Sequence, residues 1–227
     1  MKKRFIFNAI AGLIILLSTL NFTTSLAQIN DAKKDHLGFS VSFGSRSNKI
    51  TSDHSAIDKM KLMEEGASVG LLWGNDMMET KVTVGYYYSA SRVPHTVDLV
   101  NFESSFQFYP LYALSGRTHK VQPYLTTGLA ANNYKLHGYY SGAESETNYS
   151  TSIEPYLGNV TSYFGSVGAG FEVNLLDQND FVKFFSEVNY NSALYQKSSE
   201  LFKNTRVSNQ LSINVGVSFG FNRFYSK

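Results

Sequence analysis

Cysteine is absent from the 227-residue chain, and only four residues are proline. Without cysteine there is no disulfide framework, so the stability of an exported chain must come from burial or from a bilayer. After the first 27 residues no stretch approaches 18 consecutive apolar residues, which argues against a membrane-spanning helix. The five histidines include no pair at a metal-binding spacing such as His-x-x-x-His. We therefore expect no metal ion, no other cofactor and no catalytic site.

The first 27 residues have the pattern of a secretory signal peptide. Residues 2–4 are Lys-Lys-Arg, residues 9–17 form an apolar core, and residues 25–27 are Ser-Leu-Ala, with small residues two apart. This order predicts cleavage after Ala27, and the apolar core is shorter than the roughly 20 residues that a transmembrane anchor needs. We expect residues 28–36 to be a short periplasmic lead-in and residues 37–227 to form one domain.

The charge balance argues against nucleic acid as a partner. The whole chain has 20 Lys+Arg and 18 Asp+Glu. Three of the basic residues and none of the acidic ones lie in the first 27 residues, so cleavage leaves 17 basic against 18 acidic residues. The weak basicity belongs to the signal peptide and gives no basic surface for nucleic acid.

The rest of the chain alternates between apolar and small polar residues with a period of two. In the clearest segment, 211–222, every odd position is apolar and the even positions are Ser, Asn or Gly. Strict alternation of this length predicts a strand with two chemically different faces. The same pattern upstream gives eight predicted strands, at 37–45, 65–74, 79–90, 97–110, 121–136, 161–175, 181–193 and 208–223.

The composition of the polar face decides which side of the strands faces inward. A water-exposed outer face would favour Lys, Glu and Thr, because Gly and Asn are poor strand formers. The narrow lumen of an eight-stranded barrel instead requires small inward residues. Several strands also reach the roughly 9–11 residues that cross a bilayer at a tilt. We predict an all-β fold, a closed antiparallel eight-stranded up-and-down transmembrane β-barrel; a soluble lipocalin-like ligand carrier, with the faces reversed, is the alternative.

The predicted connections suggest an orientation. Links 75–78 and 176–180 are short, links 46–64, 137–160 and 194–207 are long, and links 91–96 and 111–120 are intermediate. Short periplasmic turns and long extracellular loops would place both termini in the periplasm. Outward aromatic residues then form two groups at the membrane interfaces. The periplasmic group is Trp73, Phe108, Phe184, Phe219 and Phe221, and the extracellular group is Phe43, Tyr86, Tyr88, Tyr163 and Tyr190.

Two motifs resemble those of a known family. Pro123-Tyr124-Leu125 is followed by Gly128, and residues 165–171 read Gly-Ser-Val-Gly-Ala-Gly-Phe. With the alternating strands, they resemble the small porin-like outer-membrane barrels of the OmpA-transmembrane and OmpX kind, over nearly the whole chain after residue 27. The resemblance implies a Gram-negative outer membrane, with outer-membrane lipid as partner. The last strand is similar to the insertion signal of that family, but the chain continues past Tyr225 to Ser226 and Lys227.

Charged residues on the inward face predict a network inside the barrel. A hairpin that folds symmetrically about Asp177 and Gln178 places one acid, Glu172, directly across from Lys183. We expect ion pairs that fill the lumen, because unpaired buried charges are costly. A path for ions or protons is the alternative, although eight strands leave room only for side chains. The inward charged residues are Lys81, Glu103, Glu172, Lys183 and Glu187.

The long loops are the remaining place for a function. The loop 137–160 combines several Tyr with Ser, Gly and Asn, which is adaptable contact chemistry. We expect a monomeric, non-enzymatic protein with a structural or surface-interaction role towards an extracellular ligand or an envelope protein. The alternatives are a lipid A-modifying barrel enzyme, for which His54-Ser55 and His95-Thr96 are the nearest His-hydroxyl pairs, and a subunit of an envelope secretion or motility assembly.

Overall fold

The structure is a computed structural model that describes residues 36–52, 60–90, 95–138, 156–175, 182–199 and 203–221. The predicted signal peptide, the lead-in up to residue 35 and most of the loop 137–160 lie outside these residues. In the described part, no helix is both long enough and apolar enough to cross a membrane.

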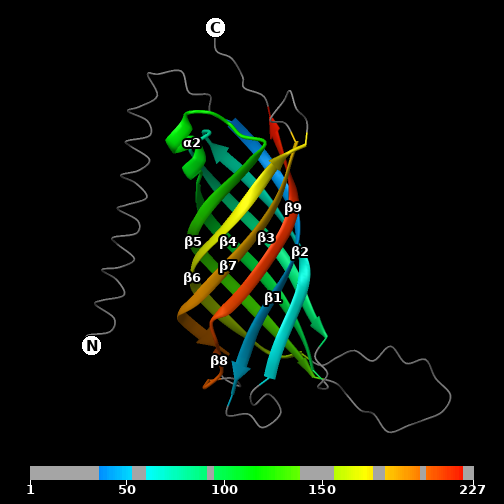
Figure 1. The fold of residues 1–227 in the computed structure, drawn as a ribbon. Coiled ribbons are helices and arrows are strands. Elements are labelled where there is room, and N and C mark those ends of the chain that lie inside the picture. Colours follow the sequence, from blue (N-terminus) through cyan, green and yellow to red (C-terminus); the bar gives the residue numbers. More distant parts are fainter. Residues whose placement is uncertain are drawn as a thin grey trace, which may run out of the picture. The chain divides into compact units, whose positions relative to one another are not determined.

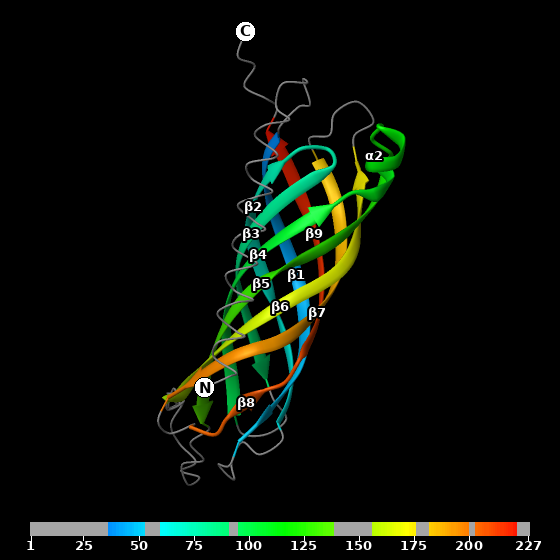
Figure 2. The same cartoon turned by 90° about the vertical axis from the view of Figure 1, so that its left-hand side faces the viewer.

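Eight long antiparallel strands form the domain, with one short strand and one short helix (Figures 1 and 2). Each long strand pairs with the next one along the chain, and β1 pairs with both β2 and the last strand, so the sheet closes. The predicted closed up-and-down barrel is confirmed. The strands are β1 (His36–Thr51), β2 (Met60–Gly74), β3 (Met78–Ala90), β4 (His95–Phe108), β5 (Val121–Gly138), β6 (Tyr156–Asn174), β7 (Val182–Ser198), β8 (Arg206–Val207) and β9 (Gln210–Phe221), with helix α2 (Pro110–Ser115) before β5.

The strands run obliquely to the barrel axis, as both ribbon views show. Passing from each residue to its paired neighbour once around the barrel, from Leu37, leads back to Ser47 on the same strand, ten residues farther along. Staggers of this size accompany strand tilts of roughly 35–45°. The intermediate residues are Trp73, Thr80, Phe106, Thr127, Val167, Tyr190 and Leu211.

Local chemistry explains the connections at the end where the barrel begins. We call this end, with His36 and helix α2, the proximal end, and the opposite end the distal end. In the β2–β3 turn, the Asn75 side-chain oxygen accepts hydrogen bonds from the backbone N–H groups of Met77 and Met78, both at 3.0 Å. Helix α2 begins at Pro110 and ends at Gly116, whose φ of 67° is the left-handed conformation that favours glycine.

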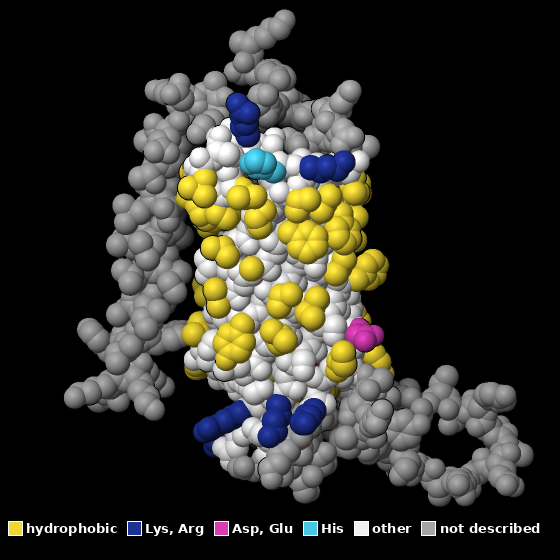
Figure 3. All heavy atoms as spheres, in the orientation of Figure 1, with side chains coloured by type: hydrophobic (Ala, Val, Ile, Leu, Met, Phe, Trp, Pro, Cys, Tyr) yellow, Lys and Arg dark blue, Asp and Glu magenta, His cyan; other side chains and the backbone are white. Residues whose placement is uncertain are grey.

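In the proximal part of the barrel, the apolar face of each strand points outward. On β2, Val69 and Leu71 expose 60% and 59% of their surface, whereas Ser68 between β1 and β3 is buried. Hydrophobic side chains accordingly cover the outer wall over much of its height (Figure 3). The predicted assignment of the faces is confirmed.

In the distal part the two faces exchange their chemistry without any change in strand direction. On β1, Phe43 is the last apolar outward residue, and the outward positions that follow are Ser45, Ser47 and Lys49, while Ile50 inside is fully buried. Strand β5 changes in the same way: Asn133 and Lys135 point outward, and Tyr134 and Leu136 are fully buried inside. The wall of the barrel is therefore apolar outside and polar inside at one end, whereas at the other end polar residues enter the outer face and large apolar residues enter the interior. Met63 and Tyr195 are exceptions that stay exposed on the outer face.

This exchange explains why several predicted strand bounds are wrong. Residues 46–51 and 60–64 belong to β1 and β2, and β6 and β7 also extend farther distally than predicted, to Tyr156 and Ser198. The prediction followed small polar residues inside and apolar residues outside, and that pattern ends before the strands do. The predicted strand 97–110 ends at Phe108, because Pro110, which was predicted as its last residue, begins α2.

Candidate functional site

A polar cluster around Glu187 fills the proximal half of the lumen. The Glu187 carboxylate lies 3.8 Å from the Lys81 ammonium group and accepts a hydrogen bond of 3.0 Å from the Tyr124 hydroxyl. The amides of Gln107 and Asn189 donate to the same carboxylate. Two of the predicted inward charges thus form a buried ion pair, with neutral donors that satisfy the remaining carboxylate lone pairs.

The predicted pair Glu172–Lys183 forms, but not in the predicted register. The Lys183 ammonium donates to the Glu172 carboxylate at 3.0 Å. Glu172 is paired with Phe185, and Lys183 is paired with Asn174, so the two charges are diagonal neighbours. The expectation that they face each other directly is wrong, because the register of β6 and β7 differs by two residues from the predicted one. Diagonal neighbours still lie within reach of side chains as long as these.

Arg46 is the central cation of the lumen, and the sequence prediction missed it. Its guanidinium donates to the Asn101 side-chain oxygen at 2.9 Å and to the Tyr87 hydroxyl at 3.2 Å, and lies 4.1 Å from the centre of the Tyr87 ring. It also lies 3.8 Å from the carboxylate of Glu103, the fifth predicted inward charge. The sequence prediction placed Arg46 in a loop. It lies four residues after Ser42 on β1, however, and therefore on the same inward face of the strand.

The sequence prediction also missed the buried acid Glu64, which, like Arg46, was placed in the loop 46–64. Its carboxylate accepts a hydrogen bond of 3.4 Å from the Gln210 side chain. The Gln210 amide also reaches the Tyr134 hydroxyl, to which Asn48 donates at 3.0 Å. These side chains connect the Arg46 cluster to the distal end of the lumen.

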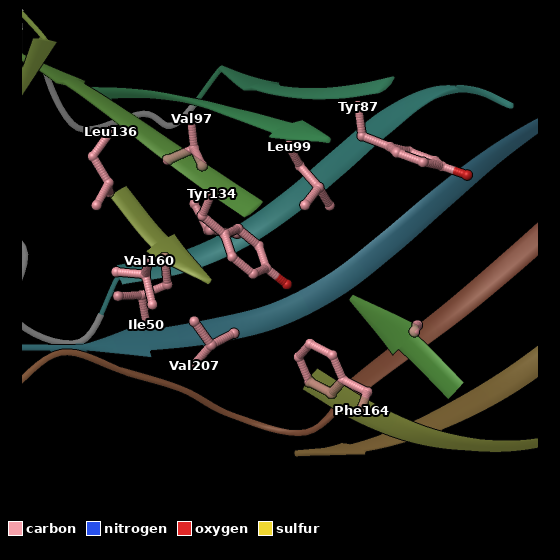
Figure 4. Close-up of a cluster of buried hydrophobic side chains, with 11 residues drawn as sticks. Ile50, Tyr87, Val97, Leu99, Tyr134, Leu136, Val160, Phe164 and Val207 are labelled. Atoms are coloured by element: carbon pink, nitrogen blue, oxygen red, sulfur yellow. The ribbon is translucent and has the colours of Figure 1, made fainter. Parts of the chain in front are cut away.

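Beyond this network, apolar side chains occupy the distal lumen. Each of the strands β1 to β6 contributes at least one fully buried residue to a cluster in which the side chains point toward one another, among them Ile50, Tyr134 and Phe164 (Figure 4). We call this cluster the distal plug. Its members are Ile50, Leu62, Tyr87, Val97, Leu99, Ala130, Tyr134, Leu136, Val160, Phe164 and Val207.

The predicted interfacial aromatic residues lie on the outer wall. Tyr86 and Tyr88 are exposed, and the Tyr86 hydroxyl donates to the Asp98 carboxylate at 2.8 Å. At the proximal end, the ring of Phe219 stacks on that of Phe39 at 4.8 Å. Trp73 and Phe108 (both partly exposed) and Phe221 (exposed) lie at the proximal ends of β2, β4 and β9. The other predicted residues are also at least partly exposed: Phe43, Tyr163, Tyr190 and Phe184. Their role at a membrane interface stays a prediction.

Neither His119 nor His137 forms a catalytic arrangement with a hydroxyl group and an acid. His119 Nε2 lies 3.0 Å from the Ser115 hydroxyl, but no described carboxylate orients this ring. His137 Nε2 lies 3.3 Å from the Asp98 carboxylate, yet no hydrogen bond forms between them. Across the described ranges, no three His, Cys, Asp or Glu side chains are grouped so as to hold a metal ion. His54 and the side chain of His95, from the two predicted His-hydroxyl pairs, lie outside the described part of the chain.

Comparisons with known proteins reveal the fold and no closer relationship. No family model and no curated protein matches the sequence. Among solved structures, Neisserial surface protein A has a TM-score of 0.51 and 16% identity, over 81% of this chain and 97% of that one. OprG of Pseudomonas aeruginosa has a TM-score of 0.49 and 13% identity, over 84% and 97% of the two chains. Ail of Yersinia pestis has 0.44 and 11%, over 83% and 99%.

The likeness to Neisserial surface protein A shows the fold alone. Together with the closed barrel and its apolar outer wall, it makes this chain similar to the small eight-stranded barrels of bacterial outer membranes. The resemblance predicted from the sequence is thereby confirmed at the level of architecture.

The Glu187 cluster gives a first test of the lumen network. We expect Tyr124→Phe to lower the free energy of unfolding by about 1.5–3 kcal/mol, because it removes a hydrogen bond to a buried carboxylate. Urea titration in detergent, with the folded fraction scored on an unboiled gel, measures the loss. Tyr88→Phe is the matched control, since the exposed Tyr88 has no hydrogen bond to its hydroxyl in the described residues; an equal loss in both variants would refute the role of the Glu187 contact.

Proposed function

We propose that this chain is a non-enzymatic outer-membrane protein that holds a water-exposed distal barrel segment and its long loops outside the cell. The proximal part of the barrel is the membrane anchor, and the termini face the periplasm. A signal peptide cleaved after Ala27 delivers the chain to the periplasm. In this role the distal end meets an extracellular ligand or an envelope protein.

The exchange of chemistry along the strands is the observation that carries this proposal. An apolar outer wall is stable in lipid, and a polar outer wall over an apolar interior is stable in water. Strand β1 passes from the first arrangement at Val41 to the second at Lys49. The distal segment is therefore built to stand in water, and the longest connection, between β5 and β6, leaves the barrel at that end.

The interior supports a structural rather than a conducting role. The charges around Glu187 and Arg46 are paired with one another and with neutral donors. The distal plug then occupies the same lumen with close-packed apolar side chains, where a hydrated ion would lose its water shell without compensation. We propose that the buried charges hold the barrel walls together and provide no path for ions.

Labelling of single cysteines on intact cells tests the orientation, because the natural chain has no cysteine to compete. Asn159 points outward in the distal segment, where it is paired with Lys135, and Thr118 is exposed at the proximal end. We expect a membrane-impermeant maleimide to label Asn159→Cys on intact cells, and Thr118→Cys only after the outer membrane has been permeabilised. The opposite result would place the distal end in the periplasm, and labelling of neither site in either state would contradict a water-exposed distal segment.

A further inference from the structure

Three cations form a patch on the outer wall of the distal segment. Lys49 on β1 is paired directly with Lys61 on β2, so that two like charges face each other across strands. Arg206 on β8 is paired with Thr51, two residues beyond Lys49. We call these three residues the basic patch. Figure 3 shows Lys and Arg side chains, in dark blue, at the distal end of the barrel, below the hydrophobic side chains in yellow.

The basic patch has no acidic partner among the described residues. Neither lysine nor Arg206 lies in an ion pair there. The acid next along the outer face of β2 is Glu65, four residues nearer the proximal end than Lys61. Like charges directly opposite each other destabilise a sheet. Such an arrangement is relieved when an anion binds between the two charges.

The position of the patch relative to the apolar wall indicates which anion this is. On β2, Lys61 is the next outward residue after Met63, which exposes 64% of its surface. On the other side of β1, the apolar Leu211 is paired with Ser47, two residues before Lys49. Two residues of a tilted strand rise by about 5 Å along the barrel axis. The ammonium groups thus begin where the hydrocarbon ends, at the level of lipid headgroups.

We propose that the basic patch binds the phosphate groups of a phosphorylated glycolipid in the leaflet at the distal end. This inference rests on the proposed function, because the distal leaflet is the outer one only in that orientation. Lysine ammonium groups and a guanidinium are suitable donors to phosphate oxygens, and the apolar wall below them accommodates the acyl chains. The patch would thereby hold one glycolipid molecule against the barrel, at the boundary between the membrane anchor and the distal segment.

The test compares lipids bound by the purified full-length mature protein in detergent, quantified by native mass spectrometry. The probes are a bis-phosphorylated lipid A-type glycolipid and the same glycolipid after removal of its phosphates. We expect the double variant K49Q/K61Q to bind the phosphorylated glycolipid about ten- to thirty-fold more weakly than the parent chain, and both proteins to bind the dephosphorylated glycolipid equally weakly. The mobility of unboiled protein on a gel verifies that the variant is folded.

The matched control is K135Q/K197Q, which also removes two lysines of the distal outer wall. These lysines lie on β5 and β7 and are not paired with each other, because β6 lies between the two strands. We expect this variant to lose less than about twofold in affinity for the phosphorylated glycolipid, since neither lysine is paired with another cation in the parent chain. An equal loss in the two variants, or equal binding of the two glycolipids by the parent chain, would overturn the patch. Preferential binding of phosphatidylglycerol over the phosphorylated glycolipid would also overturn it. Because the measurement is made in detergent, it is independent of the labelling experiment on cells, so the two proposals fail separately.

Discussion

Arg46→Met should destabilise the barrel by about 3–5 kcal/mol, because removal of one partner from a buried ionic network leaves the others uncompensated. Arg46 is 3% exposed and donates to both Asn101 and Tyr87, and its charge lies 3.8 Å from Glu103. Without it, the Glu103 carboxylate loses its nearest opposite charge in the lumen. Equilibrium unfolding in urea, scored by the mobility of unboiled protein, measures the change.

A second substitution separates the loss of charge from the loss of packing. In the double variant Arg46→Met/Glu103→Gln, both charges are replaced by neutral groups of similar volume. We expect it to recover a large part of the stability that the single variant loses, because the uncompensated charge is gone. If the double variant were as unstable as the single one, the cost would come from packing of the Arg46 stem, and the ionic account of the lumen would be wrong.

Val69→Arg should cost about 2–4 kcal/mol, whereas Asn159→Arg should cost at most about 1 kcal/mol. Both residues point outward, Val69 from β2 and Asn159 from β6. Val69 is paired with Val41 and Val84 in the middle of the apolar wall, so a charge there faces hydrocarbon. Asn159 is paired with Lys135 in the distal segment, where a charge faces water. Refolding into lipid vesicles with urea titration gives both free energies. Equal costs at the two positions would contradict the position assigned to the membrane.

The sequence contains enough information to predict the architecture of this barrel, because each strand carries its own evidence. The alternation in segments such as 211–222 depends only on neighbouring residues, and strand β9 (Gln210–Phe221) follows it closely. Closure follows from the lack of any acceptable open edge in lipid. The orientation of the faces follows from the small inward residues Ser40 and Ser42, both of which are buried.

The ends of the strands could not be predicted from that pattern alone. Beyond Phe43 the outward positions of β1 become polar, which in the sequence looks like the start of a loop. Only the register with β2 shows that the strand continues, since Lys49 is still paired with Lys61. Arg46, one missed member of the lumen network, lies in this stretch, and Glu64, another, is its register partner on β2. Continuing the even-numbered face of β1 past Gly44 would have found Arg46.

Partners inside the lumen depend on distances around the barrel rather than along the chain. Arg46 and Asn101 lie 55 positions apart, and they meet because the ten-residue stagger brings β1 and β4 to the same level inside. Similarly, Lys183 reaches Glu172 through a diagonal contact that a symmetric hairpin does not predict. The stagger is a property of the whole closed sheet, so no local pattern specifies it.

The central claim is that the proximal part of the barrel lies in lipid and the distal part in water. A scan of spin labels along β1 tests this claim most directly. One cysteine at a time replaces an outward residue, and each is labelled with a nitroxide in lipid vesicles. The account predicts greater accessibility to oxygen at the first four positions and to a water-soluble nickel chelate at Lys49, with the change between them at Ser45 and Ser47. Oxygen accessibility at all seven positions would show that lipid covers the whole strand and would contradict the exchange of faces. The positions are Leu37, Phe39, Val41, Phe43, Ser45, Ser47 and Lys49.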